Sequence, residues 1–193
     1  MKKLVETELL SLERYSRERT EFRARVIAHK KCRQVNVGPN TMWLFEDRLT
    51  VQYQVQEMLR IERIFEADGI ADELAAYNPL IPDGSNLKAT LLIEYDDVDE
   101  RRRELERLRG IEHDIRLVVE GHPAIVAIAD EDLERSNESK TSAVHFLRFE
   151  LDGAAKAAFR AGARVQLAID HPHYRATSEL DGRHRTALLA DLA

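Results

Sequence analysis

The chain has 193 residues, of which 44% are hydrophobic and 33% charged, with a formal net charge of −6 at pH 7. This composition predicts one ordinary domain with a substantial core and disfavours nucleic-acid binding, which depends on a basic face. The single cysteine, Cys32, excludes a disulfide framework within the chain and any multi-cysteine zinc or iron–sulfur site.

The N-terminal segment is predicted to be helical. Residues 4–29 carry apolar side chains among many charges, which favours a helix, in one piece or in two with Thr20 capping the second. Glu6, Glu8 and Glu13 interrupt the apolar residues, so this segment is no secretory signal peptide. No apolar run approaches the roughly 18–20 residues of a membrane span. We therefore expect a cytoplasmic protein without membrane association.

A hairpin and the most regular helix of the sequence follow. Residues 34–37 and 41–46 flank a Gly-Pro-Asn turn, which predicts two antiparallel strands. Residues 48–67 then show a helical period that Gly69 ends. In projection the apolar side chains of this helix fill one arc, which predicts its buried face. That arc contains Val51, Val55, Met58, Ile61 and Phe65.

The rest of the chain mixes strands with single helices. Helices are predicted over 71–77, 97–109 and 154–161, and strands over 87–95, 114–120, 124–129, 143–151 and 163–170. Hairpin connections and helices in blocks indicate an α+β fold. We expect a single domain over 1–193 with one largely antiparallel sheet of about five to seven strands, covered by helices, the 48–67 helix packed centrally. The polar segment 175–193 is expected to be a flexible tail.

Five stretches together resemble an uncharacterised bacterial domain-of-unknown-function family of about this length. They are FRARVIAHKK, GPNTMWLFEDRLTVQYQVQEMLRIERIFE, YNPLIPDGSNLKATLLIEYDD, ADEDLERSNESKTSAVHFLRFEL and AIDHPHY. The resemblance carries over no catalytic residues. It implies genes beside those of rubrerythrin-like di-iron proteins and an iron–sulfur oxidoreductase, and hence a redox or oxidative-stress setting with one of these proteins as partner. The chain lacks the cysteines and Glu-x-x-His pairs of those neighbours, so it would be their companion.

Polar side chains inside the apolar arc of the 48–67 helix form the first candidate site. Gln54, Glu57 and Glu62 fall within this arc, and a buried carboxylate needs a partner. One interpretation is a polar pocket or metal site built on Gln54 and Glu57. The other is structural: Glu57 pairs with Arg60 or with a core arginine, and Gln54 bonds to the backbone.

Histidines supply the second candidate site. His145 lies on an apolar strand face, either as a satisfied core histidine or, with Glu57 in reach, as a metal ligand or acid–base group. His171 and His173 lie beside Asp170 and form either a metal site or a solvent-exposed strand end. The cofactor that such ligands suit is iron or zinc. The sequence signal for a metal site is weak, and its candidate ligands are His145, Glu57, His171 and His173.

Two further surfaces are candidates. The loop before the 87–95 strand lines a cleft mouth or forms an ordered turn; its polar residues are Asn78, Asp83, Asn86 and Lys88. The polar arc of the 48–67 helix suits the carboxylates of a protein partner; it consists of Gln52, Gln56, Arg60 and Arg63. The acidic run 130–138 is expected to be a solvated linker.

The leading functional expectation is a non-catalytic accessory or binding protein of a redox or metal-handling system. The nucleophile elbow, the HExxH motif and the dinucleotide fingerprint are all absent from the sequence. One alternative is a metal-dependent enzyme or metal carrier built on Glu57 and His145. Another is a small-molecule binding module whose cleft is lined by residues 78–88. A homo-oligomer is compatible with all three.

Overall fold

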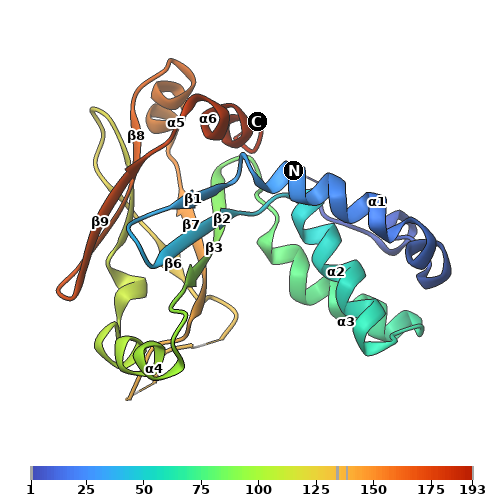
Figure 1. Ribbon diagram of the computed structural model, residues 1–193. Coiled ribbons are helices and arrows are strands. Elements are labelled where there is room, and N and C mark those ends of the chain that lie inside the picture. The colour runs from blue at the N-terminus through green and yellow to red at the C-terminus, as the bar shows by residue number, and fades with distance from the viewer. Residues whose placement is uncertain (1, 134, 138, 193) are drawn as a thin grey trace.

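The computed structural model describes residues 2–133, 135–137 and 139–192, which form an α+β fold in a single domain. Three long helices lie together on one side of the molecule (Figure 1). They are α1 (Leu12–Lys30), α2 (Arg48–Glu62) and α3 (Ala67–Tyr77), with the short 3-10 turns η1 (Glu6–Glu8) and η2 (Asn78–Leu80) beside them. No helix among the described residues is both long and apolar enough to cross a membrane.

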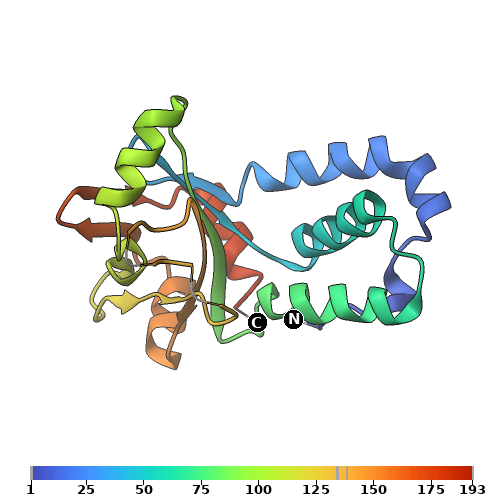
Figure 2. The ribbon, with the colours of Figure 1, turned by 90° about the horizontal axis from the view of Figure 1, so that it is seen from below.

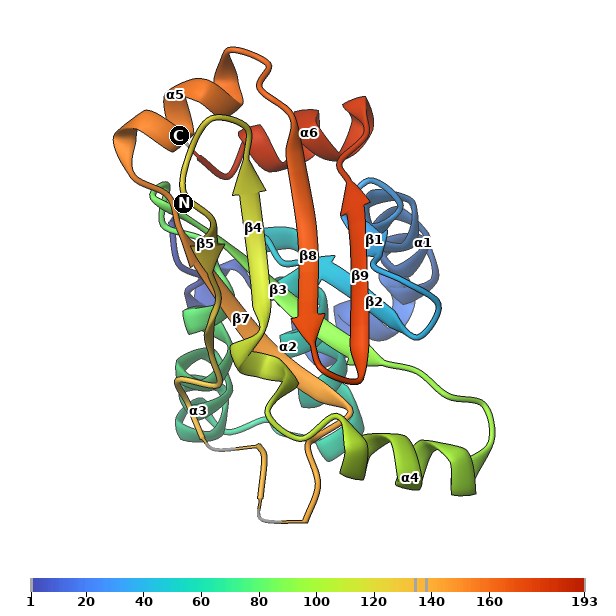
Figure 3. The same cartoon turned by 90° about the vertical axis from the view of Figure 1, so that its left-hand side faces the viewer.

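Two antiparallel sheets form the other side of the molecule (Figures 1 and 3). Sheet A has the order β1-β2-β3-β7-β6, and sheet B has the order β5-β4-β8-β9. The strands are β1 (Gln34–Asn36), β2 (Thr41–Phe45), β3 (Asn86–Ile93), β4 (Ile115–Val119), β5 (Ile125–Val126), β6 (Ile128–Ala129), β7 (Val144–Glu150), β8 (Val165–His171) and β9 (Tyr174–Glu179). The expectation of one sheet was wrong, because β5 pairs with β4 while β6, two residues on, pairs with β7.

The main core lies between the two sheets. Alternation along β3 directs Leu87, Ala89 and Leu91 into this core and leaves the intervening side chains on the outer face of sheet A, away from sheet B. Trp43 and Phe149 are fully buried there and stack at 5.8 Å. Helix α4 (Val98–Arg107) lies at one end of the sandwich, and α5 (Gly153–Arg160) and α6 (Gly182–Leu189) at the other (Figure 3).

Helix α2 is shorter than predicted and buries a different face. It ends at Glu62, because Arg63 takes a left-handed conformation (φ 57°) as the C-cap, and α3 already begins at Ala67. Ile61 is 60% exposed and Phe65 is 68% exposed, so the predicted apolar arc was wrong. The residues that α2 buries are Thr50, Val51, Val55, Gln56 and Leu59.

The place of α2 in the molecule explains this error. It lies between α1 and α3 (Figure 2), and its apolar residues pack with Leu74 of α3 in a cluster separate from the core of the two sheets. A helix with neighbours on two sides buries a wider sector than one packed on a sheet, and polar residues of that sector are covered too. The prediction that this helix packs centrally was therefore also wrong.

Both ends of the chain are more ordered than the sequence indicated. Helix α1 runs unbroken from its N-cap Ser11, whose side chain accepts a hydrogen bond from the Arg14 N–H, so Thr20 lies mid-helix and caps nothing. The segment 175–193, expected to be a flexible tail, is folded over its described residues as most of β9 and as α6. Buried Leu188 and Leu192 hold it against the main core.

Candidate functional site

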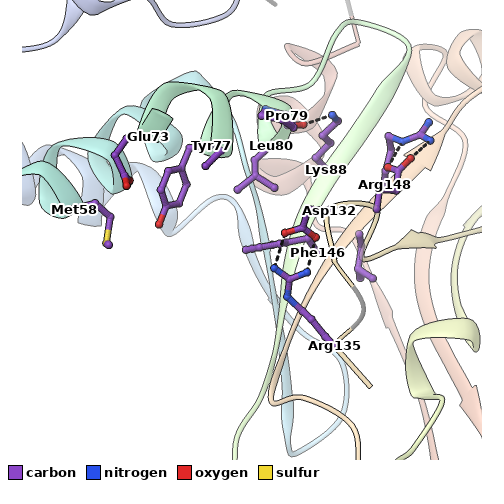
Figure 4. A pocket seen from close by; sticks show the side chains of 13 residues that line it. Met58, Glu73, Tyr77, Pro79, Leu80, Lys88, Asp132, Arg135, Phe146 and Arg148 are labelled. Atoms are coloured by element: carbon purple, nitrogen blue, oxygen red, sulfur yellow. Dashed lines mark hydrogen bonds and ion pairs between the residues drawn. The ribbon is translucent and has the colours of Figure 1, made fainter. Parts of the chain in front are cut away.

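A cleft of about 420 Å³ opens between α3 and the outer face of sheet A (Figure 4). It is lined by the α3–η2 stretch, by strands β3 and β7, by the loop that follows β6, and by Met58 of α2. Its volume is in the usual range of small-molecule sites. Tyr77, Leu80 and Phe146 supply much of its apolar lining, and the charged side chains among its lining residues are Glu73, Lys88, Glu131, Asp132, Arg135 and Arg148.

The periods of the strand and of the helix place these side chains on the faces that line the cleft. On β7 the inward positions are taken by His145, Leu147 and Phe149, so Phe146 and Arg148 lie on the outer face. On α3, residues four apart share a face, which places Glu73 and Tyr77 side by side. Figure 4 shows both pointing from α3 toward the cleft. The cleft is therefore built by one helix face and one sheet face.

Lys88 is a half-buried cation at one end of the cleft. Its ammonium donates a hydrogen bond to the Pro79 carbonyl, and no carboxylate of the described residues forms a salt bridge with it. Burial, with the nearby charges of Lys3 and Arg148, lowers the pKa of the Lys88 ammonium. Asp83 and Glu131 act in the opposite direction. We call the part of the cleft around Lys88 its basic end.

Glu73 lies at the other end. Its Oε2 atom is buried and has no hydrogen-bond partner among the described residues. Burial, together with the charges of Glu62 and Asp72, raises the pKa of the Glu73 carboxyl. Burial also raises the pKa of the Tyr77 phenol, as do Glu73 and Glu62. We call Glu62, Asp72 and Glu73 the acidic end.

The remaining cations of the cleft are neutralised by the loop after β6. Arg148 contacts Glu131 at 2.7 Å and also pairs with Glu150, while Arg135 contacts Asp132 at 2.7 Å and stacks 4.5 Å from the centre of the Phe146 ring. The run 130–138 was predicted to be a solvated linker, and several of its described residues are exposed, but Glu131, Asp132 and Arg135 also line the cleft. Among the described lining residues, Lys88 is the cation that forms no salt bridge, although Asp83 and Glu131 lie near it.

Glu57 lies outside this cleft, in an ion-paired cluster between α1 and α2. Its carboxylate accepts two hydrogen bonds of 2.8 Å from Arg19, one of 2.6 Å from the Tyr15 hydroxyl, and two from Arg60, of 3.1 and 3.4 Å. Hydrogen bonds from Arg19 chiefly hold the pKa of Glu57 down at about 2. Gln54, its neighbour in the sequence-based site, donates to the buried Glu46 carboxylate at 3.1 Å instead of to the backbone. This geometry matches the structural interpretation of Glu57.

We expect Glu57→Gln to lower the free energy of unfolding at pH 7 by about 1–3 kcal/mol, because charge-assisted hydrogen bonds are lost. The folded-state pKa of about 2 lies below the ordinary value of 4.5, so the stabilisation is complete above pH 4.5 and is lost as the pH falls toward 2. Urea denaturation at pH 7, 4 and 3 measures the gap between variant and wild type, with the exposed Glu62→Gln as control. A gap that stays constant with pH would contradict this role.

The proposed partner surface on α2 is largely covered. Gln56 is fully buried and exchanges hydrogen bonds with the Leu10 backbone, at 2.6 Å to its N–H and 3.1 Å to its carbonyl. Gln52 donates to the Glu8 carbonyl at 3.0 Å, and Arg60 pairs with Glu57. Arg63 alone of the four is exposed. The chain before α1 crosses this face of α2, so a continuous partner surface there was a wrong prediction.

His145 is fully buried in the sheet part of the molecule. Its Nδ1 contacts the Asp130 carboxylate at 2.6 Å, and its Nε2 contacts the Thr141 hydroxyl at 2.9 Å. Thr141 in turn donates to the Glu112 carboxylate at 3.3 Å. These hydrogen-bond partners are entirely different from those of Glu57, so the structure does not bring the two together into one site.

The other predicted ligands also have structural partners. The Nε2 of His171 donates to the Arg109 carbonyl and its Nδ1 accepts from the His173 N–H, each at 3.2 Å, which occupies both ring nitrogens. His173 is exposed, and Asp170 pairs with Arg175. Over the described part of the chain, no group of three or more His, Cys, Asp or Glu side chains is arranged to hold a metal ion.

Of the predicted loop residues, Lys88 reaches the cleft. Asn78 exchanges hydrogen bonds with the Leu4 backbone, Asp83 caps its own turn by accepting from the Ser85 N–H, and Asn86 donates to Glu150. The sequence analysis did not single out Glu73, Tyr77, Phe146 or Arg148 as site residues. Their spacing on α3 and β7 signals a shared face, but nothing local shows that these two faces oppose each other.

Comparison with known proteins identifies a family and a similar crystal structure, and the descriptions of both state no activity. The model of a family described as "Protein of unknown function (DUF3501)" matches residues 3–192. A crystal structure described as a novel protein of unknown function from Burkholderia pseudomallei K96243 is 52% identical, with 100% of each chain covered and a TM-score of 0.94. None of the curated proteins compared matches this chain.

Proposed function

Because the chain belongs to the DUF3501 family, whose description states no activity, we propose its function from the geometry of the cleft. The chain is a non-catalytic binding protein that holds a small organic carboxylate with an apolar body between α3 and sheet A. This is the small-molecule binding module that was an alternative from the sequence. The redox setting, with a rubrerythrin-like or iron–sulfur oxidoreductase partner, stays a prediction from the resemblance.

The observation that carries this proposal is that the Lys88 ammonium is half-buried and forms no salt bridge among the described residues. A lysine ammonium has three donors, and here one of them is engaged by the Pro79 carbonyl. Burial lowers the pKa of the Lys88 ammonium despite the nearby charges of Asp83 and Glu131, so this half-buried cation is poorly solvated. A ligand carboxylate at this end would accept charge-assisted hydrogen bonds from the remaining donors. Arg135 and Arg148 do not compete, because their own carboxylates neutralise them.

The rest of the lining supports binding of an apolar body. Tyr77, Leu80 and Phe146 present aromatic and aliphatic surface to the cleft (Figure 4), and burial of such surface favours association. The metal-dependent alternative has no comparable support, since Glu57 and His145 belong to separate hydrogen-bond networks.

We expect hexanoate to bind the wild-type protein at this cleft and Lys88→Gln to weaken that binding by about tenfold, because one charge-assisted contact is lost. Titration of the ¹⁵N-labelled protein with hexanoate, followed by NMR, locates the site and measures the affinity. The matched control is Lys31→Gln, which removes the same charge from an exposed position after α1.

The shifts that hexanoate causes should map to Tyr77, Lys88 and Phe146. Thermal unfolding of each variant first establishes that it is folded. Non-saturating shifts in the wild type, or equal affinity of the Lys88→Gln and Lys31→Gln variants, would overturn the proposed carboxylate site.

A further inference from the structure

Each end of the cleft presents one charged group, Lys88 or Glu73, that forms no salt bridge among the described residues. The basic end contains Lys88 with Lys3 and Arg148 near it, and the acidic end contains Glu73 with Glu62 and Asp72 near it. Figure 4 shows Glu73 and Lys88 on opposite sides of Tyr77 and Leu80. A cleft polarised in this way favours a ligand with a complementary dipole over a simple anion.

The Glu73 carboxylate is the second group in the cleft that lacks a partner. Its buried Oε2 accepts no hydrogen bond from the described residues, and an orphaned carboxylate oxygen costs free energy in the folded protein. No cation of the described residues forms a salt bridge with it. A primary ammonium or a guanidinium group on a ligand would supply the missing donor and the missing charge.

The spacing of the two groups sets the length of the ligand. Pro79, whose carbonyl holds the Lys88 ammonium, is six positions after Glu73 and lies in η2, just beyond the end of α3. At the rise of a helix this corresponds to about 9 Å. Tyr77 shares the helix face of Glu73 and lies between Glu73 and Lys88 (Figure 4). A chain of about five methylene groups between an amine and a carboxylate spans a comparable distance.

We propose that the ligand is dipolar, an ω-amino carboxylate or a basic amino acid, with its cationic group at Glu73 and its carboxylate at Lys88. Its apolar spacer lies across Tyr77 and Phe146. This inference rests on the proposed function, since it names the ligand class of the same cleft. It adds Glu73 as a specificity-determining residue that selects ligands by their cationic group.

Three probes of similar size test this inference on the full-length protein: 6-aminohexanoate, hexanoate, which lacks the amine, and hexylamine, which lacks the carboxylate. NMR titration at pH 8 and constant salt keeps both charges of the first probe. We expect 6-aminohexanoate to bind about tenfold more tightly than either analogue, because each analogue loses one charged contact. This comparison uses the wild-type protein, so it does not depend on the folding of any variant.

Two variants assign the cationic contact. Glu73→Gln should remove the preference for 6-aminohexanoate over hexanoate, because the carboxylate that would receive the ammonium is lost. The control Glu66→Gln removes the same charge from an exposed position of α3's N-terminus and should keep the preference. An unchanged preference in Glu73→Gln would overturn the assignment.

The outcomes separate this inference from the proposed function. If hexanoate binds as tightly as 6-aminohexanoate, the dipolar ligand is wrong and the carboxylate site stands. If hexylamine binds as tightly as 6-aminohexanoate, Lys88 contributes nothing, and both proposals fail. Binding of none of the three probes would likewise overturn both.

Discussion

Replacement of Asp191 with alanine is expected to lower the free energy of unfolding by about 3–5 kcal/mol. The Asp191 carboxylate receives two hydrogen bonds from the Arg33 guanidinium, of 2.7 and 2.9 Å, and the two side chains are 1% and 3% exposed. Asp47 contacts the same guanidinium at 3.0 Å but cannot replace the lost pair of hydrogen bonds. The variant therefore leaves a buried cation incompletely compensated, which is the costly case for a buried ion pair.

Urea denaturation followed by the fluorescence of Trp43, the single tryptophan of the chain, measures this loss. The control is Asp170→Ala, which breaks the exposed pair with Arg175 and should cost no more than about 1 kcal/mol. If the two variants are equally stable, the end of the chain is not anchored through Arg33, and the expectation of a flexible tail would regain support.

Truncation of Phe149 to alanine is expected to destabilise the protein by about 3–5 kcal/mol, whereas the same change at Phe65 should have an effect within about 0.5 kcal/mol. Phe149 is fully buried and stacks on Trp43 at 5.8 Å with an interplanar angle of 11°, so its removal leaves a cavity between the two sheets. Phe65 is 68% exposed beyond the end of α2, so its removal leaves no cavity.

The two variants are controls for each other, because the chemical change is the same. Chemical denaturation followed by far-ultraviolet circular dichroism suits both, since loss of Phe149 changes the surroundings of the Trp43 fluorophore directly. Comparable destabilisation by the two substitutions would mean that Phe65 packs in the core of α2, as the helical projection predicted.

The elements of the fold follow from short-range patterns in the sequence. The period of two in 87–95 and 143–151 predicted β3 and β7 together with the faces that they bury, including the inward position of His145. Turn residues between 37 and 41 predicted the first hairpin. These features depend on contacts between residues close in the chain, and therefore the α+β class could be derived before any tertiary structure was known.

The packing of those elements decides which polar groups are buried and which faces form the cleft. This packing depends on contacts between residues that are far apart in the sequence. Gln56 is covered because the Leu10 backbone lies against it, and Glu57 is neutralised by Arg19, 38 residues away. The cleft exists because α3 lies over Phe146 and Lys88 of sheet A. No periodicity encodes which faces meet, since the same helix face is buried or exposed according to its neighbours. The sequence by itself determined most of the elements up to β8 and Lys88 as a candidate, whereas β9 and α6 were not predicted. Only the tertiary structure placed Glu73 and Lys88 at opposite ends of one cleft, because that placement depends on contacts between segments far apart in the chain.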